Sequence, residues 1–241
     1  SVPWRYDPEA TCPRFESELL EPALDKEDVG LVQMMAGQLV LGQNVMQRLF
    51  VLTGTAGGGK STLVDVLQRL IGRHNVCSLR TEHLGERFEF EGYIRKTLLV
   101  GADVEAGFLS AKGASKLKSL TGGDFLEAEH KGGGQRSEIC GRFNVIVTSN
   151  SRLRVRMEGD VDAWRRRLVL IRYERPAPKK PVPDFAAVLM AEEGPGILNW
   201  AIRGAQMILQ LRRAAGRLLL TARQQQRVDD LLAESESVTH F

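Results

Sequence analysis

The 241-residue chain is poor in cysteine and histidine and has no long apolar run. Its three cysteines, Cys12, Cys77 and Cys140, lie far apart, as do its four histidines, so no spacing typical of a zinc site occurs. So few cysteines favour a reducing, cytosolic compartment over a disulfide framework. No segment approaches the roughly 20 apolar residues that cross a bilayer, and there is no secretion leader. We therefore expect a cytoplasmic protein without membrane contact, and the initial Ser1 suggests a fragment of a longer protein.

Aromatic residues are also scarce, at 6%, whereas hydrophobic residues make up 43% of the chain, which is enough for a folded core. The formal net charge is only +3, but it hides an asymmetry. Residues 1–50 contain eight acidic and four basic side chains, whereas residues 131–180 contain thirteen basic and five acidic ones. Such a basic segment indicates either a surface that faces a polyanion or a solvated face whose arginines pair with neighbours. Charge alone favours neither.

The hydrophobic pattern divides the chain into three parts: residues 1–47, 48–180 and 181–241. Helical spacing in the first part predicts a small N-terminal helical subdomain, which we expect to serve as a collar for oligomerisation. The middle part alternates helical stretches with short apolar runs typical of buried parallel strands. This alternation predicts an α/β fold with a mainly parallel five-stranded sheet flanked by helices on both faces. The expected strands are residues 48–53, 75–79, 97–101, 143–148 and 168–173, and the expected helices are residues 63–71, 82–88 and 111–120.

The last part follows a proline-rich connector at residues 176–183. Two helices are expected after the connector, over residues 185–192 and 196–211. A final helix is expected over residues 221–241, with no closing element after it. The sequence therefore predicts a C-terminal helical segment that follows the α/β core.

A glycine-rich run between the first strand and the following helix fits the Walker A pattern: Gly54-Thr55-Ala56-Gly57-Gly58-Gly59-Lys60-Ser61-Thr62. Glycines let the backbone curl so that its N–H groups point at phosphate oxygens, and the following helix directs its positive end to the same place. Lys60 would reach the β- and γ-phosphates of ATP, and the Ser61 hydroxyl would ligate Mg²⁺. The alternative is a glycine-rich turn in another α/β fold.

Two acids follow the strand at residues 97–101, and they are candidates for catalysis. A phosphoryl-transfer site needs one carboxylate for the Mg²⁺ shell and one to orient the attacking water. We assign Asp103 to the Mg²⁺ shell and Glu105 to the water, with the reverse assignment left open. The alternative is a pair of solvated loop acids.

The next strand ends in Asn150, whose amide could hold the water near the γ-phosphate, although asparagine is also common in turns. Three arginines then precede the strand at residues 168–173. Arg166 or Arg167 could act as an arginine finger on the γ-phosphate of an adjacent subunit, or the run could be a solvated helix end.

Two strand-like segments, residues 125–130 and 136–140, flank a glycine-rich tip. This pattern predicts a hairpin that carries positive charge at Lys131 and Arg136. Such a hairpin could contact the phosphodiester backbone of DNA, with an affinity that falls with salt. The alternative is an ordinary exposed hairpin.

Taken in order, these segments resemble the superfamily 3 helicases, in particular the helicase half of phage and plasmid primase–helicases. The resemblance covers nearly the whole chain. It rests on the series of motifs: residues 4–8 (WRYDP), 12–15 (CPRF), the glycine-rich loop, 117–124 (LKSLTGGD), 148–150 (TSN), 164–167 (WRRR) and 196–200 (GILNW).

The resemblance implies a AAA+ P-loop NTPase that assembles into a ring, usually a hexamer, and pulls single-stranded DNA through its centre with 3′→5′ polarity. Lys60, Ser61, Asp103, Asn150 and an Arg166 or Arg167 finger would match the site for ATP and Mg²⁺. Lys131 would match the channel hairpin. The family further implies a primase domain in the full-length protein and a gene carried by a phage, plasmid or integrated element in a bacterial host.

This sequence departs from the family pattern in its acids, which read Asp-Val-Glu in place of two adjacent carboxylates. Two other functions stay open at this point. One is a replication initiator that binds DNA as a ring and uses ATP only as an assembly switch. The other is a monomeric P-loop kinase that acts on a small molecule with its own arginines.

Overall fold

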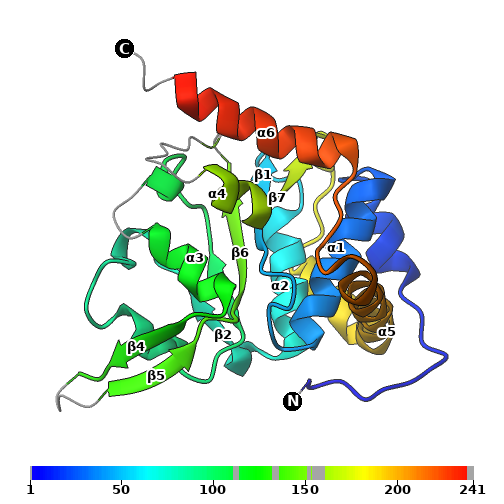
Figure 1. The fold of residues 1–241 in the computed structure, drawn as a ribbon. Coiled ribbons are helices and arrows are strands. Elements are labelled where there is room, and N and C mark those ends of the chain that lie inside the picture. The colour runs from blue at the N-terminus through cyan, green and yellow to red at the C-terminus, as the bar shows by residue number, and fades with distance from the viewer. Residues whose placement is uncertain (1, 111–113, 132–135, 151–152, 154–160, 238–241) are drawn as a thin grey trace.

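The structure of the protein is a computed structural model that describes residues 2–110, 114–131, 136–150, 153 and 161–237 (Figure 1). Five strands form one parallel sheet in the order β2-β3-β6-β1-β7. The predicted five-stranded parallel sheet is therefore present. The strands are β1 (Leu49–Gly54), β2 (Val76–Ser78), β3 (Leu98–Gly101), β6 (Asn144–Ser149) and β7 (Leu168–Tyr173).

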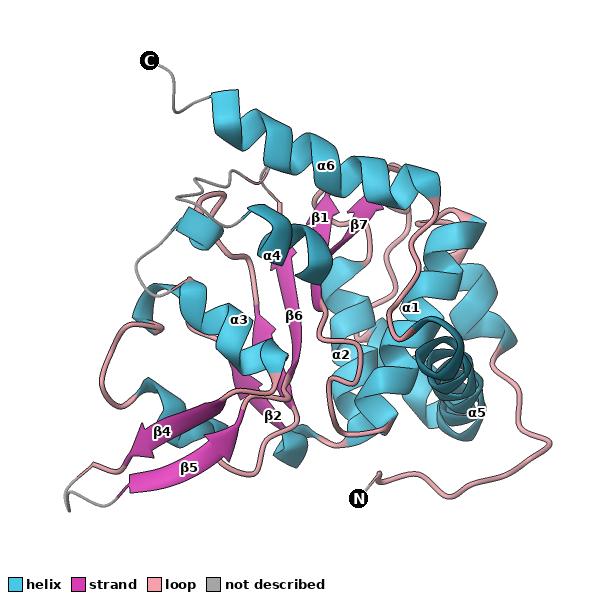
Figure 2. Cartoon of the chain, in the orientation of Figure 1, coloured by secondary structure: helices cyan, strands magenta, loops and turns pink. Residues whose placement is uncertain are grey.

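Helices cover both faces of the sheet (Figure 2), and alternate residues of β1 point to opposite sides. Phe50 and Leu52 pack in the core beneath α1, α2 and α5, whereas Leu49 and Val51 pack in the core beneath α3, α4 and α6. An apolar run without alternation is therefore the expected sequence for this strand. The helices are α1 (Lys26–Val40), α2 (Lys60–Ile71), α3 (Ser115–Gly122), α4 (Val161–Arg167), α5 (Phe185–Ala215) and α6 (Ala222–Ser237).

The predicted N-terminal helices are a π-helical segment, Phe15–Leu20, and α1, and both pack against α5. The contact between α1 and α5 is so close that it needs glycine on each side. A Cβ at Gly37 would lie 2.1 Å from the Ala205 nitrogen, and one at Gly204 would lie 1.9 Å from the Gln33 carbonyl oxygen. The first and last parts of the chain therefore share one core with the sheet.

The prediction of two helices over residues 185–192 and 196–211 is wrong, because α5 is one helix with Pro195 inside it. Proline removes one helical hydrogen bond and crowds the preceding turn. Here the residues on either side of it are glycines, and they lie against residues near the start of the chain. A Cβ at Gly194 would come within 2.5 Å of the Trp4 ring, and one at Gly196 would lie 2.0 Å from the Thr11 carbonyl oxygen. Tertiary packing therefore holds the helix together across the proline.

The predicted helix at residues 82–88 is also absent. In its place are two short 3₁₀ turns, Thr81–His83 and Glu89–Tyr93. Gly85 lowers the helix propensity of the segment. The buried Glu89 carboxylate also accepts a hydrogen bond of 2.8 Å from the Tyr93 hydroxyl, which fixes the second turn against the core.

The predicted hairpin consists of the antiparallel strands β4 (Phe125–Glu129) and β5 (Arg136–Cys140), with Glu129 opposite Arg136. It lies apart from the parallel sheet (Figure 2). Its tip at residues 132–135 lies outside the described residues, as do residues 111–113 of the helix expected at 111–120 and residues 238–241 of the last one. Among the described residues, no helix has the length and apolar character needed to span a membrane.

A buried ion pair attaches α6 to the start of α1. Arg227 Nη1 donates to Asp28 Oδ2 at 2.6 Å, and the two side chains are only 6% and 1% exposed. Gln224 Nε2 donates to the other carboxylate oxygen, Oδ1, at 3.0 Å. Buried pairs of this kind are costly to break because the remaining charge has no partner.

We predict that Asp28→Ala lowers the free energy of unfolding by about 3–5 kcal/mol, because it leaves the Arg227 charge buried and unpaired. Chemical denaturation measures the change. The double variant Asp28→Leu/Arg227→Met should recover most of the loss, because no charge then remains buried. The control is Arg223→Ala, which removes an exposed pair with Asp25 and should cost less than about 1 kcal/mol. Equal losses in Asp28→Ala and Arg223→Ala would contradict this account.

Candidate nucleotide-binding site

The glycine-rich loop joins the end of β1 to the start of α2, as the Walker A pattern predicts. Gly54, Gly57 and Gly59 have φ angles of 124°, 75° and 98°, a region that side chains other than glycine rarely adopt. At Gly54 space also excludes a side chain, because a Cβ would lie 2.2 Å from the Tyr173 carbonyl oxygen. The first N–H groups of α2 have no acceptor within the helix. The curled loop and the helix start therefore form a cradle of donors suited to an anion.

Lys60 lies in this cradle and is only 4% exposed. Its ammonium donates to two loop carbonyl oxygens, Gly54 O at 2.9 Å and Thr55 O at 2.7 Å. Burial lowers the pKa of Lys60, and the nearby Asp103 carboxylate opposes this shift. The ammonium also lies 5.9 Å from the centre of the Tyr173 ring. A buried ammonium held by carbonyl oxygens can exchange them for phosphate oxygens, which are stronger partners.

Asp103 and Asn150 follow two neighbouring strands, β3 and β6, and are hydrogen-bonded to each other. Asn150 Nδ2 donates to Asp103 Oδ1 at 2.9 Å, and the Asp103 N–H donates to Thr148 Oγ1 at 3.0 Å. Asp103 has a φ of 46°, which this hydrogen bonding supports. Since Asp103 also acts on Lys60 electrostatically, the structure brings Lys60, Asp103 and Asn150 to one edge of the sheet.

Two other predicted residues at this edge are exposed. Ser61 lies at the start of α2, directly after Lys60. Glu105 lies two residues after Asp103, and its side chain has no hydrogen bond or ion pair with any described residue. A free carboxylate beside a cradle for phosphate can take part in proton transfer or metal binding without first breaking an ion pair.

Arg166 and Arg167 end α4 directly before β7, at the opposite edge of the sheet from the glycine-rich loop. The six residues of β7 separate the two edges by on the order of 17–20 Å. Arg166 Nε donates to Asp162 O at 3.3 Å, and Arg167 Nη1 donates to Ala163 O at 3.2 Å. Neither arginine is therefore placed to reach the loop of its own chain.

The hairpin residues differ in how they are held. Lys131 is exposed, and its backbone N–H donates to Glu91 Oε1 at 3.4 Å. Arg136 forms ion pairs with Glu127 at 2.9 Å and with Glu129 at 3.9 Å. Glu127 and Glu129 of β4 therefore neutralise the charge of Arg136. Lys131 is the more available cation for an external ligand.

A cavity of about 240 Å³ opens beside the glycine-rich loop. Gly57, Gly58, Gly59 and Thr62 form one wall. The other walls are mainly apolar. They come from the end of the π-helical segment and the turn after it, from the proline-rich connector and from the start of α5, and they include Leu19, Pro22, Pro176, Val182 and Phe185. The first part of the chain is predicted only as a helical subdomain and residues 176–183 only as a connector, so the sequence pattern does not indicate this cavity. Adjacent prolines and apolar residues in a connector were the available signal.

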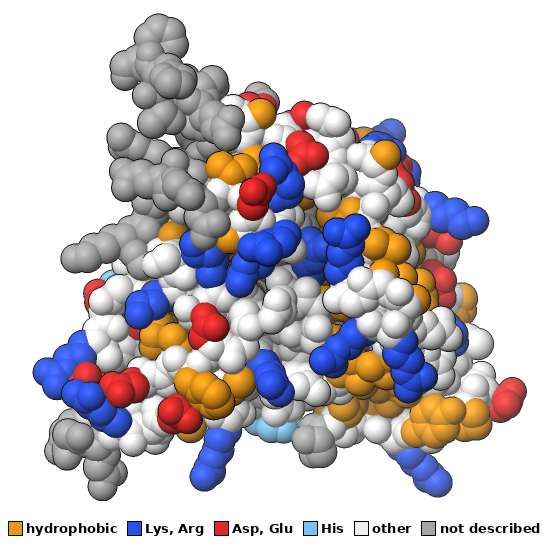
Figure 3. Space-filling view, viewed as in Figure 1, with side chains coloured by type: hydrophobic (Ala, Val, Ile, Leu, Met, Phe, Trp, Pro, Cys, Tyr) orange, Lys and Arg blue, Asp and Glu red, His pale blue; other side chains and the backbone are white. Residues whose placement is uncertain are grey.

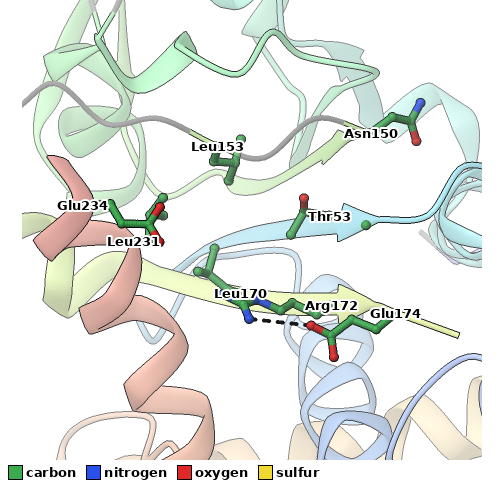
Figure 4. Close-up of a pocket in the computed structure, with 9 residues that line it drawn as sticks. Thr53, Asn150, Leu153, Leu170, Arg172, Glu174, Leu231 and Glu234 are labelled. Carbon is green, nitrogen blue, oxygen red and sulfur yellow. Dashed lines mark ion pairs between the residues drawn. The ribbon is translucent and has the colours of Figure 1, made fainter. Parts of the chain in front are cut away.

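A second cavity, of about 300 Å³, lies at the carboxyl ends of β1, β6 and β7 (Figure 4). Thr53, Gly54 and Asn150 line it from the strand ends, and Leu231 and Glu234 of α6 line it from the other side. Its wall also contains an ion pair of 3.6 Å between Arg172 and Glu174. Polar groups from three strands and one helix thus surround a space next to Asn150.

The sequence matches one family model, and the fold resembles solved structures of other proteins. Residues 52–167 match a family model described as a family of unknown function (DUF5906). No curated protein matches the sequence. Two solved structures of the C-terminal region of NrS-1 resemble this chain with TM-scores of 0.67 and 0.71, at 17% sequence identity. They align with 94% and 97% of this chain.

The chain spans only about half of those NrS-1 structures, 53% of each. A structure of JCV helicase aligns with 87% of this chain and 61% of its own, at 17% identity and a TM-score of 0.39, which is too low to support an argument. At such identities a likeness shows the fold alone. The likeness to the C-terminal region of NrS-1, together with the sheet, confirms the predicted α/β fold with a five-stranded parallel sheet flanked by helices.

Proposed function

We propose that this chain is the ATP-hydrolysing motor of a superfamily 3 DNA helicase, which works as a hexameric ring on single-stranded DNA. One observation carries the proposal. The loop lysine, Asp103 and Asn150 meet at the carboxyl edge of the sheet, whereas Arg166 and Arg167 stand at the opposite edge. A chain with this arrangement completes a phosphoryl-transfer site only when a second copy supplies the arginine.

The residues at the carboxyl edge suit ATP and Mg²⁺. Backbone N–H groups of residues 54–62 would hold the phosphate oxygens, and Lys60 would leave its two carbonyl partners for the β- and γ-phosphates. Ser61 and Asp103 would hold Mg²⁺, which would neutralise negative charge on the phosphates. The apolar cavity beside Gly57 would receive the base of the nucleotide.

Hydrolysis also needs a group that orients the attacking water. Glu105 is exposed and without a partner among the described residues, so it would accept the proton of that water. Asn150 would keep Asp103 in place through its hydrogen bond of 2.9 Å. The two acids could exchange these roles, because one buried residue, Val104, separates them and both flank the same strand end.

The arginines favour a ring over a monomeric kinase. A kinase acting alone would need Arg166 or Arg167 beside its own phosphate loop, and β7 separates the two. A head-to-tail ring instead sets the amino edge of one copy against the carboxyl edge of the next. In such a ring Lys131, at the hairpin, would contact the phosphodiester backbone. A primase domain would lie elsewhere in the full-length protein of a phage, plasmid or integrated element.

We predict that Lys60→Ala lowers the rate of ATP hydrolysis by about 10²–10³-fold or more, because it removes the charge that stabilises the transferring phosphoryl group. A steady-state phosphate-release assay measures the rate. The control is Lys116→Ala, at an exposed lysine of α3, which should retain the parental rate. An unchanged rate in Lys60→Ala would refute the proposed ATP site.

Single-stranded DNA should stimulate ATP hydrolysis, and Lys131→Ala should reduce this stimulation about 3–10-fold with a shallower salt dependence, because one phosphate contact is lost. Arg136→Ala should have a smaller effect, since Arg136 is already paired with Glu127. The assay is run beside a mass measurement of the assembly. If a verified oligomer hydrolyses ATP at the same rate with and without single-stranded DNA, the helicase proposal is ruled out. If the oligomer binds ATP without turnover, ATP acts as an assembly switch.

A mixing experiment tests whether the site is shared. Lys60→Ala and the double variant Arg166→Ala/Arg167→Ala should each be inactive alone. In an equal mixture about one quarter of the subunit contacts would combine an intact loop with intact arginines, so activity should reappear. If the mixture stays inactive although mixed rings form, the arginines do not act between subunits.

A further inference from the structure

A hollow of about 550 Å³ lies at the amino edge of the sheet, and we call it the amino-edge pocket. It is enclosed by the start of β1, the end of α4, the segment between α5 and α6, and one face of α6. Figure 3 shows Lys and Arg side chains gathered across this side of the molecule, below α6. Five arginines line the pocket: Arg48, Arg165, Arg166, Arg167 and Arg217.

Arg48 is the buried member of this set. It is only 7% exposed, and its Nη2 donates to the Leu218 carbonyl oxygen at 2.7 Å. Among the described residues, no carboxylate lies within ion-pair distance of its guanidinium. Burial, with a smaller contribution from the nearby Arg217, lowers the pKa of Arg48 to about 10. A buried cation in proteins normally has an anionic partner, and Arg48 has none among the residues that the structure describes.

The other charges of the amino-edge pocket do not compensate for Arg48. The one acid among its described lining residues, Asp229, accepts from Arg165 Nε at 2.8 Å, and Arg165 also pairs with Asp162. Among the described residues, Arg166 bonds to a backbone carbonyl oxygen and to no carboxylate, and Arg217 forms no ion pair. The pocket therefore presents at least three guanidinium groups without a carboxylate, around a space large enough for several phosphate groups.

We propose that the amino-edge pocket binds a chain of phosphates, with Arg48 at its base and Arg166 and Arg217 at its rim. Guanidinium groups suit this ligand because each offers paired N–H donors that match phosphate oxygens. The ligand has two sources. It is either the triphosphate on the loop of a second copy, in which case the inference rests on the proposed function, or a free polyphosphate, in which case it does not.

The first test measures binding of tripolyphosphate by calorimetry, in the Lys60→Ala background so that the glycine-rich loop contributes little. Arg217→Glu reverses one charge of the pocket and should weaken binding at least about tenfold. The control is Arg213→Glu, which makes the same change of net charge at an exposed position of α5 outside the pocket and should change the affinity less than about twofold. Arg48→Gln should weaken binding in the same direction as Arg217→Glu.

The second test distinguishes the two sources, using the parental loop and ATP-dependent association measured by mass. If the phosphates come from a second copy, Arg217→Glu should raise the protein concentration needed for association about tenfold, while Arg213→Glu does not. If they come from a free polyphosphate, association stays unchanged and only tripolyphosphate binding is lost. The proposal is overturned if Arg217→Glu and Arg213→Glu behave alike in both tests. Because the calorimetric test does not require ATP hydrolysis, its result stands even if the chain proves not to be a motor.

Discussion

The parallel pairing of β1 with a strand on each side, β6 and β7, is the constraint on which the candidate sites depend. Parallel strands must all run the same way, so every strand ends at one edge of the sheet and begins at the other. The glycine-rich loop, Asp103 and Asn150 follow different strands and meet because their strands end together. The same rule places Arg48 beside Arg167, since both precede the paired strands β1 and β7.

The sequence was informative where structure is local. Four of the five strands are short apolar runs, and the loop has glycines where the backbone needs positive φ angles, so these features were predictable. The continuity of α5 across Pro195 was not predictable, because it depends on packing against residues near the other end of the chain. Likewise, no local pattern marks Arg48 as a buried charge.

In the candidate site, too, local features were predictable from the sequence and long-range contacts were not. Lys60, Asp103 and Asn150 could be selected because each follows a predicted strand, and the fold then brought them together. The apolar cavity beside Gly57 was missed because its walls come from the N-terminal segment and from a connector far along the chain. The pairing of Arg136 with Glu127 was also missed, since it depends on the register of the hairpin. Long-range contacts thus account for most of what the sequence did not reveal.

The central position of β1 also has a consequence for synthesis of the protein. The ribosome produces β1 before its partners β6 and β7, which follow about a hundred residues later, after several seconds or more at roughly 5–20 residues per second. During that time the apolar strand has neither neighbour, and such an edge can pair with other chains. In a nascent chain with this order of strands the sheet therefore closes late. Chaperones that shield residues 49–54 during this time would raise the yield of folded protein.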